Sequence, residues 1–171
     1  MDGARLWNAA VAQNVSPDSL ARHADTVTVC FSKGLGAPVG SVLTGPKPFV
    51  AEALRLRKML GGGMRQAGIL AAGALYALDH HRDALADDHV HARMLSDVLE
   101  STSWAQVPVR PETNILFVQT PGRTSAEVVA RLADQGVRCS AMGADRFRLV
   151  THRDVSRAQV IRACEVLRTL Y

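Results

Sequence analysis

Apolar residues along the chain form short runs separated by polar and glycine-rich segments, and this pattern predicts an α/β protein. The run TVTVCF (26–31) is β-branched and apolar throughout, which is typical of a strand buried on both faces of a parallel sheet. The segment 64–78 is small and apolar nearly all round, so it predicts a buried helix. Further strands are predicted at 39–44, 114–119, 137–139 and 147–151, and further helices at 3–12, from 16 onward, 46–59, about 87–101, 124–135 and 156–171.

Short local signals mark several helix ends. Ser16 is a good N-cap, and Pro17 fits the first turn of the short helix that follows it. Three glycines at 61–63 end the helix before them, and Gly136 caps the end of another.

The composition changes at residues 79–88 (DHHRDALADD), which is the best candidate for a hinge between two domains. Residues 1–80 are predicted to be α/β with a buried parallel strand, and residues 88–171 a smaller α+β unit. No internal repeat is visible.

The composition is that of an ordinary globular protein, because 47% of the 171 residues are hydrophobic and 21% are charged. Aliphatic residues are too abundant for a disordered chain, and no run approaches the ~20 apolar residues that span a membrane. The first twelve residues have no basic region followed by a long apolar run, so no secretory signal is predicted. The three cysteines form no close pair, which argues against a disulfide framework or zinc motif and favours a cytoplasmic protein.

The net charge of +4 comes from 20 basic residues that are scattered singly rather than clustered. Aromatic residues are only 5% of the chain, so neither the charge nor the stacking pattern of a nucleic-acid binder is present. Only three of the basic residues are lysines, Lys33, Lys47 and Lys58. Chemistry that depends on a lysine therefore has three candidates.

Lys33 directly follows the predicted strand 26–31 and lies in a glycine-rich turn. The carboxyl ends of strands are where α/β enzymes bind ligands, and a lysine held there among small residues can act as a nucleophile. An exposed loop lysine without function fits the same position. The glycines at 34, 36 and 40 do not form a dinucleotide-binding loop, because their spacing is one residue too long and a strand follows.

Asp2 lies 31 residues before Lys33, with a predicted helix and strand between them. Such groups at successive strand ends would face one crevice. An aspartate that pairs with a ring nitrogen, together with a lysine that forms an imine, is what pyridoxal phosphate requires. A helix N-cap is the structural alternative for Asp2.

Four segments together carry a resemblance to a known family. They are DGAR (2–5), FSKGLGAPVGS (31–41), RKMLGGGMRQAG (57–68) and RLVTHRDV (148–155). In this order, and across the whole chain, they resemble the low-specificity L-threonine aldolases, which belong to the β-eliminating lyase group of fold-type-I pyridoxal phosphate enzymes. The resemblance implies the C-terminal part of a large cofactor-binding domain within 1–80 and a small α+β C-terminal domain at 88–171. It also implies a homo-oligomer, a dimer or tetramer, with the site near a subunit interface.

The resemblance also implies roles for single residues toward pyridoxal 5'-phosphate. Lys33 would bond covalently to the cofactor, and Asp2 would pair with the protonated pyridine nitrogen. Arg5 would lie beside the phenolic oxygen. Lys58 and Arg65 would lie near the phosphate and could reach it across a subunit boundary, although basic residues at a helix end also cap carbonyls.

The activity implied by the resemblance is cleavage of the Cα–Cβ bond of a β-hydroxy-α-amino acid. Threonine or allo-threonine would give glycine and acetaldehyde, with Arg148 binding the substrate α-carboxylate through its planar fork. The base that accepts the β-hydroxyl proton is not identified in this sequence. Another β-eliminating lyase or a transaminase of the same fold is one alternative, and a non-catalytic remnant is the other.

One departure from the family concerns the N-terminal side. In the family the DGAR motif lies past the middle of the chain, and a phosphate-binding turn and functional histidines precede it. None of these is present here, and the histidines of this chain fall in helix or surface contexts. We therefore expect a fragment, or a chain that starts at an internal methionine.

Overall fold

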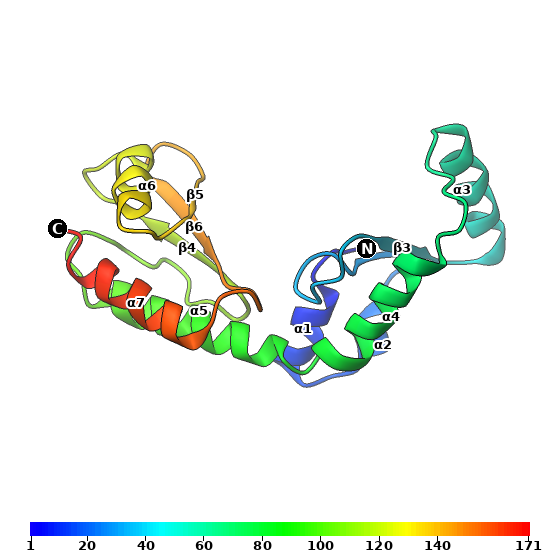
Figure 1. Cartoon of the computed structure of the whole chain (residues 1–171), viewed down its shortest axis with the longest axis horizontal. Helices are drawn as coiled ribbons and strands as arrows, with labels where there is room; N and C mark the ends of the chain where they lie inside the picture. Colours follow the sequence, from blue (N-terminus) through cyan, green and yellow to red (C-terminus); the bar gives the residue numbers. More distant parts are fainter. The chain divides into compact units, whose positions relative to one another are not determined.

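The computed structural model describes all residues from 1 to 171 (Figure 1). The chain divides into two compact units, Met1–Leu85 and Ala86–Tyr171. The boundary lies within the segment 79–88, where the composition of the sequence changes. Each unit has its own sheet and its own apolar core.

The first unit is built on a three-stranded sheet in the order β1-β2-β3. Strand β1 (Asp2–Gly3) runs parallel to β2 (Val27–Cys30), and β3 (Ser41–Thr44) pairs antiparallel with β2. The register places Asp2 opposite Thr28, so the segment DGAR enters the sheet directly beside the central strand.

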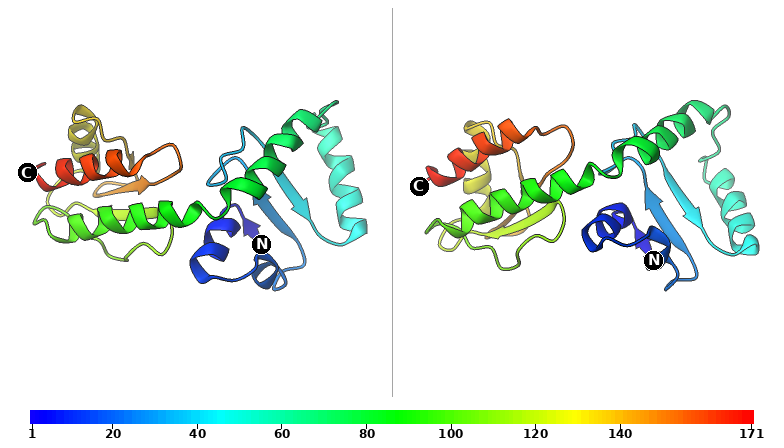
Figure 2. Two further views of the ribbon diagram at one scale, coloured as in Figure 1. Left: turned by 60° about the horizontal axis from the view of Figure 1, so that its bottom comes forward. Right: turned by 90° about the horizontal axis from the view of Figure 1, so that it is seen from below.

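Four helices accompany this sheet: α1 (Leu6–Gln13), α2 (Pro17–Ala21), α3 (Lys47–Met59) and α4 (Gly68–His81). Helix α1 packs Leu6 against Val27 and Val29 of β2, which forms one small core cluster. A second cluster joins Leu35, Ala37, Ala77 and Leu85. Figure 2 shows that α3 lies beyond β3, at the outer edge of this unit, and none of its residues is buried.

The second unit has an antiparallel sheet in the order β4-β6-β5, formed by β4 (Ile115–Gln119), β6 (Arg146–Val150) and β5 (Ser140–Ala141). Its helices are α5 (Leu85–Glu100), α6 (Ser125–Asp134) and α7 (Arg157–Arg168). Alternate strand residues are buried and open, which is typical of a sheet with one covered face. The covered face carries the main core, with Leu116, Val118, Phe147 and Leu149 inside.

Three predictions about burial and strands are wrong. The strand at 26–31 is buried on one face only, because Val27 and Val29 are buried while Thr28 between them is exposed. The helix predicted as buried exists as α4, but Ala77 is its only buried residue. Residues 137–139 form no strand, and the short strand β5 begins one residue later.

No helix of this chain combines the length and the apolar character needed to cross a bilayer.

Candidate functional site

The DGAR segment is held against the central strand of the first sheet by a very close backbone approach. A Cβ atom on Gly3 would lie 2.6 Å from the carbonyl oxygen of Thr28, so only glycine fits at this position without moving a strand. The Asp2 carboxylate accepts a hydrogen bond of 3.0 Å from the backbone N–H of Ala4. Asp2 does not cap α1, because the N-cap position is Arg5, so the structural alternative for Asp2 is wrong.

The turn after β2 presents Lys33 at the surface. A hydrogen bond of 2.8 Å from the Gly36 N–H to the Lys33 carbonyl closes the turn, and Gly36 has a φ of 71°, which favours glycine. Leu35 anchors the turn because its side chain is completely buried. The Lys33 side chain is exposed and forms no hydrogen bond or ion pair within the chain. Its amine is therefore open to a ligand.

Helix α1 packs directly against this turn. The indole N–H of Trp7 donates a hydrogen bond of 3.1 Å to the Cys30 carbonyl at the end of β2, and the Trp7 ring stacks on Phe31. A Cβ atom on Gly34 would lie 3.0 Å from the Asn8 amide oxygen, so α1 and the residue after Lys33 are in close contact. The helix that follows DGAR and the turn that carries Lys33 thus form one packed assembly.

The position of Asn8 was not predicted from the sequence. Its side chain is almost completely buried between α1 and the turn. An asparagine within a small and apolar helix gives no signal of such a contact in a single sequence. The contact depends on how α1 docks on β2, which only the structure shows.

Lys58 lies near the end of α3 and Arg65 lies on the segment between α3 and α4, and both are exposed. Lys58 is in the last turn of α3, where the Gly62 N–H donates a hydrogen bond of 2.8 Å to the Arg57 carbonyl. Backbone N–H groups therefore satisfy the carbonyls at this helix end. In both views of Figure 2, helix α3 lies apart from the loop that connects β2 and β3.

Arg148 lies in the second unit, on the central strand β6, opposite Phe117 of β4 and Ser140 of β5. It points to the open face of the sheet, because its neighbours Phe147 and Leu149 fill the core. The Nε atom of Arg148 is buried and has no hydrogen-bond partner. A buried donor without a partner is costly, so this guanidinium fits an anionic ligand that would satisfy it.

Two of the three cysteines, Cys139 and Cys164, are poor alternatives to Lys33 as nucleophiles. Burial raises the pKa of the Cys139 thiol to about 11 and also raises the pKa of Cys164. Both thiols therefore stay protonated near neutral pH, whereas the reactive form of cysteine is the thiolate.

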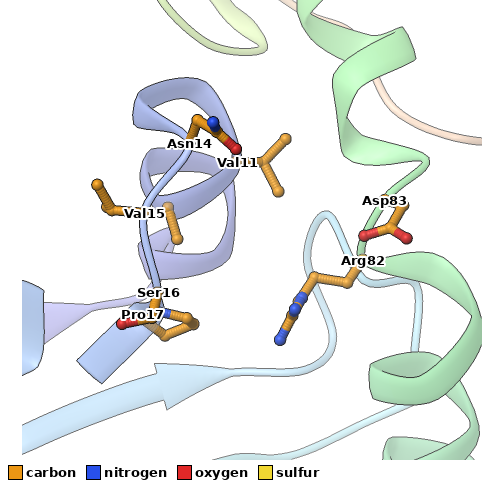
Figure 3. Close-up of a pocket in the computed structure, with 8 residues that line it drawn as sticks. Val11, Asn14, Val15, Ser16, Pro17, Arg82 and Asp83 are labelled. Atoms are coloured by element: carbon orange, nitrogen blue, oxygen red, sulfur yellow. The ribbon is translucent and has the colours of Figure 1, made fainter. Parts of the chain in front are cut away.

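A cavity of about 430 Å³ opens in the first unit between the end of α1 and the residues after α4 (Figure 3). Asn14, Ser16, Arg82 and Asp83 supply its polar groups. None of the residues proposed above for a cofactor or substrate lines it, and it is not the candidate site.

Comparison with solved structures identifies the class of fold. The structure of a threonine aldolase from Leishmania major superposes on this chain with a TM-score of 0.80 at 22% sequence identity. The superposition covers 99% of this chain and 50% of the Leishmania chain. This chain therefore has the α/β architecture of fold-type-I enzymes.

Sequence comparison identifies the family. The family model described as beta-eliminating lyase matches residues 1–121, and the chain belongs to that family. A low-specificity L-threonine aldolase of Escherichia coli is 42% identical over 160 residues, which cover 94% of this chain and 47% of the relative. Low-specificity L-threonine aldolase 1 of Arabidopsis thaliana is 41% identical over 164 residues, which cover 94% of this chain and 46% of that relative. The chain spans about half the length of these curated relatives.

Proposed function

We propose that this chain is part of a pyridoxal-phosphate-dependent aldolase that cleaves β-hydroxy-α-amino acids to glycine and an aldehyde. Family membership and the names of two relatives support this activity, and threonine and allo-threonine are the proposed substrates. The observation that carries the proposal is the packing of α1, the helix that follows DGAR, against the Lys33 turn through Trp7 and Asn8. Strand β1, which contains Asp2, is parallel and adjacent to β2, which precedes Lys33, and this arrangement supports one shared site.

The residues of the first unit fit the cofactor chemically. Pyridoxal phosphate, when bound, supplies an electron sink for the pair of electrons released by the broken Cα–Cβ bond. Lys33 has the exposed, unpaired amine that covalent attachment needs, and Asp2 has the carboxylate that a protonated ring nitrogen needs. Arg5 is half-buried at the start of α1 and is proposed to face the phenolic oxygen.

Lys58 and Arg65 are proposed as phosphate contacts made across a subunit boundary. Both are exposed and contact no other residue of this chain through an ion pair, which supports a contact from a second subunit. A homo-oligomer with the site near the subunit interface is part of the same proposal.

The proposed substrate contact is Arg148, which would hold the α-carboxylate. Its unpartnered Nε and its place on the open face of the second sheet support this role. Residues 1–80 are proposed to belong to the large cofactor-binding domain and residues 88–171 to the small C-terminal domain. No residue of this chain is proposed as the base for the β-hydroxyl proton.

The covalent assignment of Lys33 is tested by borohydride reduction in the presence of pyridoxal phosphate, followed by peptide mass spectrometry. The chain holds only three lysines, so the modified position is read without ambiguity. We expect the adduct on Lys33, its loss in Lys33→Ala, and its retention in Lys47→Ala, a matched exposed lysine at the start of α3. An adduct that persists at the same yield in Lys33→Ala would contradict the assignment.

The reaction is tested by product analysis with threonine, using the protein that contains this chain at its natural length. Glycine and acetaldehyde are expected in equal amounts. Release of ammonia would instead identify another β-eliminating lyase, and a keto acid formed with an amino acceptor would identify a transaminase. The absence of any turnover, with the cofactor bound, would favour the non-catalytic remnant.

A further inference from the structure

The second unit contains a separate cavity of about 570 Å³ that the proposed function does not use. It lies between α7, the end of β6 and the segment that follows α6. Cavities of a few hundred Å³ are the usual size for small-molecule sites. None of the residues proposed for the cofactor or the substrate lines it.

The interior of this cavity is mainly apolar. Its walls include Leu95, Val137, Leu149, Val155, Val160 and Ala163. Thr151 also lines the cavity, but its hydroxyl donates a hydrogen bond of 2.6 Å to the Asp88 carbonyl and so has no proton to donate to a ligand. The interior therefore favours a hydrocarbon group rather than a polar one.

The ionisable side chains that line the cavity are all basic. Arg138, Arg162 and His152 line it, and no carboxylate does. Arg162 pairs with Glu165 at 3.2 Å, and His152 lies 3.5 Å from Asp154, so both have anionic neighbours. Arg138 is exposed and has no ion pair or hydrogen bond of its own. One uncompensated cation thus stands beside an apolar interior.

We propose that this cavity binds a small amphipathic carboxylate, with its hydrocarbon tail against the apolar walls and its carboxylate at Arg138. A hydrocarbon tail matches the walls, and an anion matches a lining that carries cations and no acids. The site differs from the proposed substrate site in its residues, because Arg148 does not line it.

The proposal is tested by equilibrium dialysis of the whole chain with octanoate and, separately, with the neutral 1-octanol. We expect octanoate to saturate one site per chain. Arg138→Gln should weaken octanoate binding by about two- to fivefold, the effect of losing one exposed ion pair, and leave octanol binding unchanged. Arg157→Gln is the matched control, because Arg157 is on α7 but does not line the cavity. Equal octanoate binding in Arg138→Gln and the wild type would overturn the assignment of the carboxylate.

A second variant tests the cavity itself. Ala158 is exposed on the cavity wall, so Ala158→Trp fills the space without entering the core. It should abolish the saturable binding of both ligands, whereas Ala133→Trp, at an exposed position of α6 that does not line the cavity, should not. If octanoate still saturates one site in Ala158→Trp, the ligand sits elsewhere on the chain and the proposal fails.

Discussion

Arg148 has an environment that supports its proposed role as a substrate contact. The residues on either side of it, Phe147 and Leu149, belong to the core. Arg148 lies on the opposite face of the sheet, paired with Phe117, and its buried Nε has no hydrogen-bond partner. A donor in this state is costly unless a ligand satisfies it, so its retention in the centre of a sheet favours a binding role.

We predict that Arg148→Ala impairs turnover of the amino-acid substrate by about 2–5 kcal/mol in kcat/KM, the cost of leaving a desolvated carboxylate without its partner. Arg148→Lys should also be impaired, because an ammonium group cannot reproduce the planar fork. Cofactor binding, followed by absorbance, should be preserved in both variants. Steady-state kinetics in the natural-length protein provide the measurement, and unchanged kinetics would reassign Arg148 to a structural role.

His89 is a second residue whose environment sets a measurable property. Burial lowers its pKa below the ordinary value of 6.5, and the nearby charge of Arg93 acts in the same direction. The folded chain therefore binds this proton less readily than the unfolded chain. The contribution of His89 to stability is complete above about pH 6.5 and is lost as the pH falls through its lowered pKa.

We predict that the free energy of unfolding decreases as the pH falls below about 6.5, and that His89→Gln makes this decrease smaller. His23→Gln is the control, because His23 is exposed, and it should keep the wild-type dependence. Urea unfolding at a fixed protein concentration measures the effect. An identical pH dependence in wild type and His89→Gln would show that another group dominates.

At the scale of elements, the turn after β2 depends on one buried side chain. Leu35 is completely buried in a cluster with Ala77 and Leu85, while Lys33 two residues earlier is exposed. The turn is thus fixed from inside and leaves its lysine free at the surface.

We predict that Leu35→Ala destabilises the first unit by about 2–5 kcal/mol, the usual cost of a buried leucine truncation. It should also slow formation of the reducible adduct at Lys33, because the turn is no longer held. Val39→Ala, at an exposed position of the same loop, should change stability by less than about 0.5 kcal/mol. Hydrogen exchange and the adduct assay together check this, and an undisturbed Lys33 reaction in Leu35→Ala would contradict it.

Several elements could be predicted because their signals are local. Ser16 caps α2 by accepting a hydrogen bond of 3.2 Å from the Ser19 N–H, as its position before Pro17 indicates. The strand predicted at 137–139 was wrong because register is not local. Pairing of Ser140 with Arg148 decides where β5 lies, and no composition signal specifies that pair.

The candidate site was predictable only in part, for a related reason. Lys33 and Asp2 follow from the order of strand and glycine-rich turn, and from motifs that resemble a family. The contact between Asn8 and Gly34, and the orphan Nε of Arg148, depend on packing between elements distant in sequence. Packing of this kind cannot be predicted from a single sequence.

At the scale of the whole molecule, the first unit leaves an unusual amount of apolar surface open. Ile69, Leu75 and Tyr76 of α4 are 78%, 60% and 59% exposed, and Leu60 after α3 is 83% exposed. The apolar sequence of α4 predicts a helix that is packed on all sides. In this chain, however, Ala77 is the only residue of α4 that is buried. Exposed apolar areas of this kind mark surfaces that other protein segments cover.

We predict that the 171-residue chain expressed alone associates and does not cleave threonine. Its α4 surface would be buried between copies, because contiguous apolar patches of this kind are poorly tolerated on a soluble monomer. Ile69→Lys combined with Leu75→Lys should reduce the association, whereas Val109→Lys should not, because Val109 is a single exposed residue of the second unit. Size-exclusion chromatography with light scattering measures the association, and a threonine cleavage assay measures the activity. A monodisperse monomer with cofactor-dependent cleavage would show that the open surface of α4 needs no partner and that this chain holds a complete site.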